Sequence, residues 1–112
     1  MLRVGFARIR PEKESRLRAW LTELGTREAE VIESFLRETT RHEQAFIMPS
    51  EAGPVLVYAM EVEDPVFAAA AYKDSSLSID IEHRAVLEEC LLERLKIEPL
   101  FDCAVKGRNE AA

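Results

Sequence analysis

VLVYAMEVE, residues 55–63, is the stretch that decides the fold, because it is the strongest strand signal in the chain. Valine and tyrosine favour an extended backbone, on which their side chains pack well. The preceding segment PSEAGP, residues 49–54, holds two prolines and a glycine and predicts a turn. A second strand candidate covers residues 42–48, so the three segments together predict a β-hairpin.

The chain downstream of the hairpin predicts two helices and a last strand. We expect Asp64 to cap the first helix and Pro65 to begin it, because these residue types favour those two positions. SIDIEHRAVLEECLLERL, residues 78–95, predicts the second helix, with Ser78 as its cap. Residues 100–105 predict the last strand.

The chain upstream of the hairpin predicts one strand and one broken helix. Residues 2–9 alternate between two partly apolar faces, which is typical of a strand. Pro11 suits a first helical position, and apolar residues then recur with a period near 3.6. A single helix over residues 11–38 would be about 42 Å long, against a radius of gyration of about 13 Å for a domain of this size. We therefore expect a break at Gly25, the weakest helix former in the middle.

The element order β-α-β-β-α-β is that of the ferredoxin-like, split βαβ motif. It predicts an α+β fold in which helices cover one face of a four-stranded antiparallel sheet. The other face is apolar as well, because Phe46 and Met48 alternate with Ala45 and Ile47 along one strand. A bare apolar face requires a cover, and a second copy related by a two-fold axis is the simplest one. The sequence therefore predicts a homodimer.

The composition fits one domain and argues against several classes of partner. We expect residues 1–106 to form the domain and residues 107–112 a flexible tail. The 21 acidic and 15 basic residues give a formal net charge of −6, which argues against nucleic acid or an anionic membrane as partner. The sequence has no run of 18 apolar residues and no signal peptide, which predicts a cytoplasmic protein. In that compartment Cys90 and Cys103 are expected as reduced thiols rather than as a disulfide.

Two ionisable residues fall within apolar helical stripes. His83 has apolar neighbours on the predicted helix, and Glu28 lies in the direction of Leu24 if the first helix is continuous. A carboxyl group in an apolar setting has a raised pKa, and histidine titrates near neutrality, so both are candidates for proton transfer. A break at Gly25 would instead place Glu28 in water, and a lone helical histidine is often a hydrogen-bonded core residue.

The segment RHEQAF, residues 41–46, places a histidine beside a glutamate at the start of a strand. Successive side chains of a strand point to opposite faces, so His42 and Glu43 cannot bond directly. The predicted hairpin puts Glu43 on the same face as Tyr58. We favour this pair as the pocket-side set, on the open face of the sheet. The alternative is a single buried hydrogen bond that serves no ligand.

The chain offers few other sites. Two histidines and scattered carboxylates do not match the usual spacing of metal ligands, so no metal is expected. The glycines are isolated and form no phosphate-binding loop, and we expect no cofactor. Asp80 and Arg84 lie four residues apart on one predicted helix and are expected to form an ordinary surface pair.

The phrases GPVLVYAMEVED, residues 53–64, and SIDIEHRAVLEECL, residues 78–91, resemble a small, functionally uncharacterised family of the dimeric α+β barrel superfamily. The resemblance extends over residues 4–105. It implies a homodimer with a ligand pocket between the open face of the sheet and the helices or the partner subunit. The rhamnose mutarotases are distantly similar, and their catalytic tyrosine and histidine fall here on Leu17 and Leu21. Leucine cannot transfer a proton, so the resemblance does not carry the mutarotase mechanism.

The sequence thus supports two functions. The first is a small-molecule enzyme, either an isomerase or a cofactor-free oxygenase, in which Glu43 and His83 are catalytic and Glu28 and Tyr58 bind the ligand. The second is a non-catalytic ligand-binding or structural dimer. Convergence of these polar residues on one site would favour the enzyme.

Overall fold

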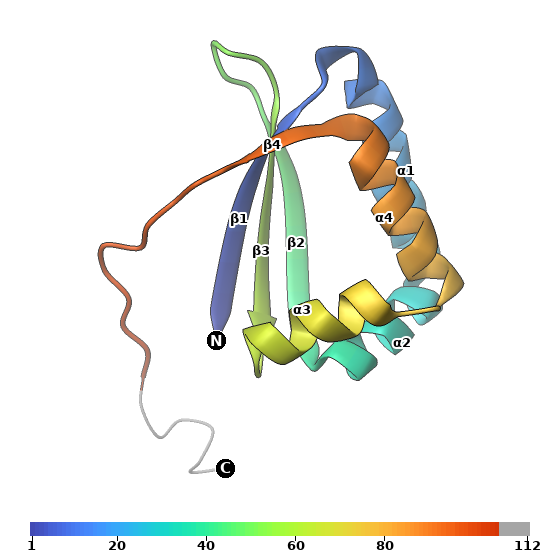
Figure 1. Ribbon diagram of the computed structural model, residues 1–112, viewed down its shortest axis with the longest axis vertical. Coiled ribbons are helices and arrows are strands. Elements are labelled where there is room, and N and C mark those ends of the chain that lie inside the picture. Colours follow the sequence, from blue (N-terminus) through green and yellow to red (C-terminus); the bar gives the residue numbers. More distant parts are fainter. Residues whose placement is uncertain (106–112) are drawn as a thin grey trace.

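A computed structural model describes residues 1–105, and the predicted tail over residues 107–112 lies outside them. The strands form one sheet in the order β2-β3-β1-β4, and all neighbours are antiparallel. Figure 1 shows the helices on one side of this sheet. The α+β, ferredoxin-like prediction is therefore confirmed. The strands are β1 (Leu2–Ile9), β2 (Thr40–Met48), β3 (Val55–Val62) and β4 (Leu91–Leu95).

Two helix starts differ in how they are capped. The Asp64 side chain accepts hydrogen bonds from the backbone N–H groups of Val66 and Phe67, at 3.0 and 3.1 Å, as predicted for the cap of α3. The predicted cap Ser78 is instead the first residue of α4, and no side chain caps this helix. The helical elements are η1 (Pro11–Lys13), α1 (Glu14–Thr26), α2 (Glu28–Glu38), α3 (Pro65–Asp74) and α4 (Ser78–Cys90).

The first helical stretch is broken, as its length requires, but at Arg27 rather than at Gly25. The backbone of Arg27 leaves helical geometry, with φ −114° and ψ 43°. Its guanidinium group pairs with carboxylates of Glu23, Glu30 and Glu82, at 2.7 to 2.9 Å. These ion pairs hold the break and connect it to α4, which is why a charged residue and not the glycine marks it.

The last strand lies earlier in the chain than predicted. α4 ends at Cys90, and Leu91–Leu95 pair with β1 at the edge of the sheet. The predicted helix over residues 78–95 is therefore too long, and the predicted strand over residues 100–105 is wrong for this subunit. Pairing with β1 outweighs the helical pattern of LLERL, because tertiary contacts routinely override local propensity.

The two faces of the sheet differ in burial. Ala7, Ile9 and Leu56 lie on the helix-covered face and are at most 3% exposed. Phe46 and Met48 lie on the open face and remain 50% and 42% exposed. The helices complete the core above the first face with Leu17, Trp20, Ile79, Val86 and Cys90.

A bulge at the start of β2 decides which of its side chains face the helices. The ladder with β3 shifts register between Thr40 and His42, so Arg41 is an extra residue. Thr40 is 6% exposed under the helices. In a regular strand Thr40 and Glu43 would point to opposite faces, because the side-chain period is two. The bulge lets both of them face the helices.

Candidate functional site

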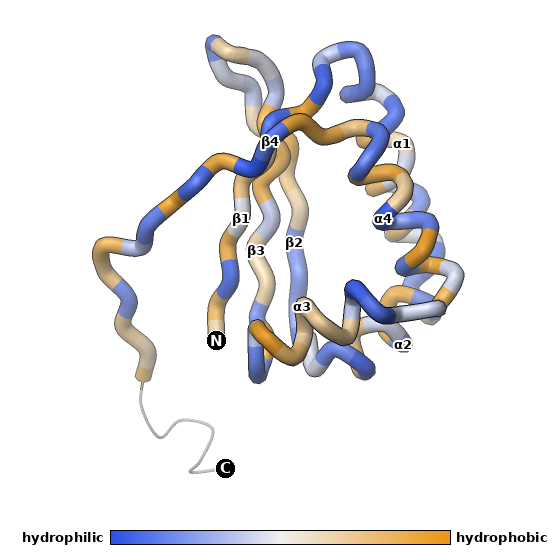
Figure 2. The backbone as a smooth tube through the Cα atoms, viewed as in Figure 1, coloured by the Kyte–Doolittle hydropathy of each residue, from blue (hydrophilic) through white to orange (hydrophobic). Residues whose placement is uncertain are grey.

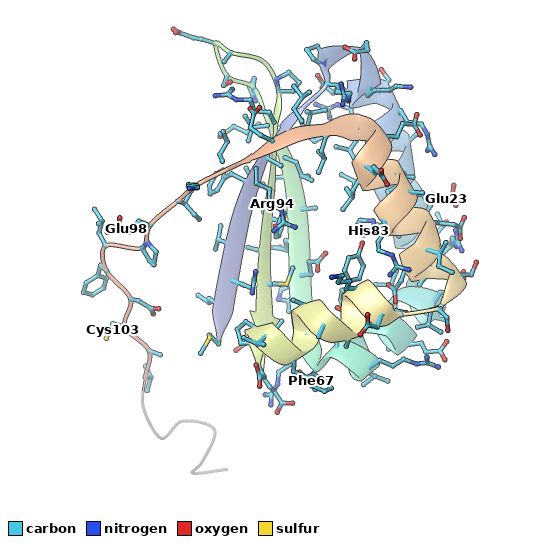
Figure 3. All side chains as sticks on the ribbon, in the orientation of Figure 1. Glu23, Phe67, His83, Arg94, Glu98 and Cys103 are labelled. Atoms are coloured by element: carbon cyan, nitrogen blue, oxygen red, sulfur yellow. The ribbon has the colours of Figure 1, made fainter. Side chains whose placement is uncertain are left out.

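Acidic and aromatic side chains meet between the sheet and the helices. They come from α2, β2, α3 and α4, and their charges act on one another's pKa values. Figure 3 shows the His83 side chain between α4 and the sheet. We call this group the interior polar cluster; its members are Glu38, Glu43, Tyr72, Asp80 and His83.

His83 is held as a neutral hydrogen-bond donor. The indole N–H of Trp20 donates to His83 Nδ1 over 2.8 Å. An indole nitrogen can only donate, so Nδ1 carries no proton and Nε2 carries it. Burial lowers the pKa of His83 to about 4, against a smaller opposing effect of Asp80. At pH 7 the ring is therefore neutral and presents its Nε2–H.

Tyr72 has a buried hydroxyl group for which residues 1–105 provide no hydrogen-bond partner. Its ring meets the His83 ring edge-on, with centroids 6.0 Å apart. Burial raises the pKa of Tyr72, and the negative charges of the cluster add to the increase, so the group stays protonated. An unpaired buried hydroxyl costs about 1–3 kcal/mol and is rare in native proteins. Tyr72 is therefore a candidate binding position.

Glu43 is the carboxyl group of the cluster whose pKa lies near neutrality. Burial raises the pKa of Glu43 to about 7, and the neighbouring Glu38 carboxyl adds to the increase. Both protonation states are therefore populated at pH 7. A general acid or base works best under this condition.

Glu38 and Asp80 share the hydroxyl group of Ser34, which is 4% exposed. Ser34 Oγ lies 2.7 Å from Glu38 Oε2 and 2.7 Å from Asp80 Oδ1. One hydroxyl has one proton to donate, so one of the two carboxyl groups must donate its own. Burial raises the pKa of Glu38, whereas Asp80 accepts a second hydrogen bond from Ser75 Oγ over 2.6 Å.

The predicted surface pair of Asp80 and Arg84 is wrong. Asp80 is only 5% exposed. Arg84 instead donates to the backbone carbonyl groups of Tyr72 and Ser75, at 2.5 and 2.7 Å. It thereby fixes the end of α3 to α4, and with it the position of Tyr72.

Glu43 and Tyr58 share a face, as the hairpin predicts, but it is the helix-covered face and not the open one. Glu43 lies opposite Met60, and Tyr58 lies opposite Ala45. The expected open-face placement is wrong because alternate residues of a strand share a face, and the β3 residues that alternate with Tyr58 include the buried Leu56. Within residues 1–105 no hydrogen bond joins Glu43 to Tyr58.

Tyr58 lies across Gly5, its partner on β1. A Cβ atom on Gly5 would overlap the Tyr58 ring, so only glycine permits this close approach. Tyr58 packs against the hydrophobic core, on the same face of the sheet as Glu43.

Glu28 and His42 lie away from the interior polar cluster. Of the two placements left open for Glu28, the structure shows the exposed one, because the break at Arg27 ends the apolar stripe before it. His42 lies opposite Glu61 and is exposed on the open face, whereas the expected open-face placement of Glu43 would have turned His42 towards the helices. The sequence therefore selected two members of the cluster, Glu43 and His83.

Other candidate sites are weak. Among residues 1–105 no group of three or more histidine, cysteine, aspartate or glutamate side chains could hold a metal ion. None of the helices over that range is long and apolar enough to cross a membrane. A surface hollow of about 220 Å³ between α1 and α4 is lined in part by Trp20. Trp20 thus lines this hollow and also donates to His83.

The fold and the cluster together define an α+β protein with a ferredoxin-like sheet and buried ionisable groups beneath its helices. The chain belongs to the family of unknown function DUF6176, whose profile matches residues 2–105. A solved structure, that of Rv0793 from Mycobacterium tuberculosis, is similar with a TM-score of 0.51 and 18% sequence identity. The match covers 92% of this chain and 96% of the other and concerns the fold alone. No curated protein sequence matches the chain significantly.

The sequence reasoning missed Glu38 and Tyr72, and each had a local signal. Glu38 ends α2, where a carboxylate is unfavourable beside the negative end of the helix dipole. Tyr72 follows a run of four alanines, at the end of a short helix. An acid or an aromatic residue at such a position indicates a tertiary contact.

Proposed function

We propose that the interior polar cluster binds a small molecule and moves a proton on it. One observation supports this proposal above all others. The buried, unpartnered hydroxyl of Tyr72 lies within electrostatic reach of a carboxyl group, Glu43, whose pKa is about 7. Neither feature adds to the stability of a core, whereas a proton-transfer site can use both.

The three groups suit a substrate with an activated C–H bond next to a carbonyl group. Glu43 as carboxylate accepts the proton from carbon. Tyr72 O–H and His83 Nε2–H donate hydrogen bonds to the carbonyl oxygen, where negative charge develops. An isomerase then needs no further reactant, because Glu43 returns the proton to a second carbon. A cofactor-free oxygenase begins with the same proton removal but requires dioxygen as co-reactant.

The proposal assigns different roles to the predicted site residues. Glu43 is the acid–base residue, and His83 is a neutral donor, since its pKa of about 4 excludes it as a base for this proton. Tyr58 is the wall of the binding site. The exposed Glu28 has no part in it.

We further propose that the working form is a cytosolic homodimer of the dimeric α+β barrel kind. Val4, Phe46 and Met48 expose 42–50% of their surface on the open face of the sheet, a patch that a monomer rarely leaves bare. Cys90 and Cys103 are free thiols, which agrees with a reducing compartment.

A thermal-shift screen with small ketones, keto acids and phenols tests the binding step. A ligand that binds only the native state raises the melting temperature. For each ligand that binds the wild type, we expect the dissociation constant to rise at least tenfold in Tyr72→Phe and to stay unchanged in the control His42→Gln. Hits that are equal in all three proteins would place the ligand elsewhere.

Proton exchange separates an enzyme from a non-catalytic binding module. With a ketone hit in D₂O, an enzyme replaces hydrogen by deuterium at the carbon next to the carbonyl group, which NMR detects. Glu43→Gln should bind the ligand but stop the exchange, because an amide cannot transfer a proton at neutral pH. Binding by the wild type without exchange would support the module instead.

A further inference from the structure

We propose that residues 96–105, which we call the C-terminal arm, cross to a second copy of this chain and cover the open face of its sheet. The inference rests on the homodimer proposed above and adds the segment that closes it. Figure 1 shows the arm leaving β4 on the side of the sheet opposite to the helices.

The arm has no cover within its own subunit. Each of its residues is exposed, and Leu100, Phe101 and Val105 expose 90%, 87% and 78% of their surface. Figure 3 shows Glu98 and Cys103 far from the sheet and the helices. An extended segment loses conformational entropy and gains little unless its apolar side chains are buried. The arm therefore needs a surface outside its own subunit.

The sequence of the arm has the pattern of a half-buried strand. Its odd-numbered residues are all apolar, and three of its five even-numbered residues, Lys96, Glu98 and Asp102, are charged. Figure 2 shows the resulting alternation of hydropathy along the segment. The arm includes residues 100–105, which the sequence predicts as the last strand. No strand forms there within the subunit, and a partner surface would account for the pattern.

The open face of the sheet offers the matching surface. Phe46 and Met48 lie on β2, which pairs with β3 only and so leaves one edge of its backbone free. An arm laid over Phe46 and Met48 would bury its apolar side against them, and where it follows the β2 edge it would also satisfy the free backbone groups.

A second copy is the occupant that the geometry favours. Every subunit carries both an uncovered apolar face and an uncovered apolar arm, and both lie on the same side of the sheet. A two-fold axis lets two subunits exchange arms reciprocally and leaves neither surface bare. A different protein would cover the face but leave the arm exposed.

Sedimentation velocity on full-length variants tests the role of the arm in assembly. We expect Phe101→Asp to shift a micromolar dimer to monomer, with at least a tenfold rise in dissociation constant. Val66→Asp is the matched control, because Val66 is 80% exposed on α3, on the other side of the sheet, and should leave the dimer intact. A dimer that is unchanged by Phe101→Asp would overturn the arm proposal while the homodimer stands. A monomeric wild type would overturn both.

Cross-linking shows directly whether the arm crosses between chains. One chain keeps Cys103 on its arm, and its partner carries Cys103→Ser with a new thiol, Gln44→Cys, on the open face. A short thiol-reactive cross-linker should join the two different chains in a mixture. The control thiol Glu88→Cys on α4 should link far less. Equal cross-linking of Cys103 to the thiols at residues 44 and 88, or no cross-linking to residue 44, would contradict the exchange of arms between subunits.

Discussion

Glu43 and His83 respond to burial in opposite directions, and the sign of each response sets a pH window. Burial raises the pKa of Glu43 to about 7, so the stability from its protonated form is present below about pH 4.5 and is lost as the pH rises towards 7. Burial lowers the pKa of His83 to about 4, so the stability from its neutral form is present above about pH 6.5 and is lost as the pH falls. Between about pH 4.5 and 6.5 the two contributions oppose each other.

Single substitutions should separate these two contributions. In Glu43→Gln the contribution of Glu43 that opposes that of His83 is removed, so the free energy of unfolding should rise more steeply with pH than in the wild type between pH 4.5 and 6.5. In His83→Gln the contribution of Glu43 is no longer opposed by that of His83, and the free energy of unfolding should fall as the pH rises from 4.5 towards 7. Glutamine can still accept the hydrogen bond from Trp20, which keeps the contact. Each shift corresponds to about 3.4 kcal/mol at most.

Urea unfolding at a series of pH values measures both profiles. The open-face control His42→Gln should follow the wild type, because His42 is exposed. Parallel profiles for Glu43→Gln and His83→Gln would show that neither residue has the protonation state assigned here.

We expect the unpaired hydroxyl of Tyr72 to lower the free energy of unfolding of the protein without a ligand. Tyr72→Phe removes a buried polar group for which residues 1–105 offer no partner, so we expect a gain of about 1 kcal/mol. Tyr58→Phe is the matched control, because no unpaired buried atom is found on Tyr58, and it should bring no such gain. Thermal unfolding checks both variants. A loss of stability in Tyr72→Phe would mean that the hydroxyl has a structural partner, and the binding role would fail.

The residues of the site could be predicted only where local pattern suffices. Glu43 and His83 stand out because an ionisable residue in an apolar pattern is visible in the sequence itself. The bulge at Arg41 is not visible, because it depends on the ladder with β3. Tyr72 gains its significance only when Arg84 fixes α3 to α4, a contact between separate helices.

The elements of the fold were predictable to the extent that their signals are local. The strand β1 and the hairpin of β2 and β3 follow from alternation and a proline-rich turn, and the cap of α3 follows from Asp64. The boundary between α4 and β4 was not predictable, because LLERL fits a helix as well as a strand. Its pairing with β1, distant in sequence, decides between them.

Two glycines of these elements should respond in opposite ways to alanine. Gly5→Ala forces a Cβ atom into the Tyr58 ring and should destabilise the protein by about 1–3 kcal/mol. Gly25→Ala meets no neighbouring atom within 4 Å in α1 and should stabilise it by up to about 1 kcal/mol. Chemical denaturation of the two variants measures the sign of each change in the free energy of unfolding. A neutral Gly5→Ala would show that the tyrosine can move aside, and the wall of the proposed site would not be rigid.

The molecule as a whole has one closed side and one open side. Four helices bury the interior polar cluster above one face of the sheet, whereas the other face and the C-terminal arm expose apolar side chains. The sequence predicts this arrangement, because it places apolar side chains on both faces of the strands and enough helices to cover only one of those faces. It does not reveal that the arm leaves the subunit, because the same alternation also fits a strand within it.

The homodimer is the prediction that belongs to this scale. We expect sedimentation velocity of the wild type at micromolar concentration to give a single species with twice the mass of the chain. Phe46→Asp on the open face should yield monomers that remain folded, because the side chain is half exposed. A wild-type monomer with no tendency to associate would show that the open face tolerates water.

The central claim is that the assembled fold creates an acid–base group near neutrality at Glu43, on β2 and close to Glu38 at the end of α2. The most direct measurement is the titration of the Glu43 carboxyl carbon by ¹³C NMR in the intact protein, with Glu43→Gln to assign the signal. The structure predicts a midpoint near pH 7, because burial and the Glu38 carboxyl both favour the protonated form. A midpoint near 4.5, the value of an ordinary glutamate, would contradict the claim.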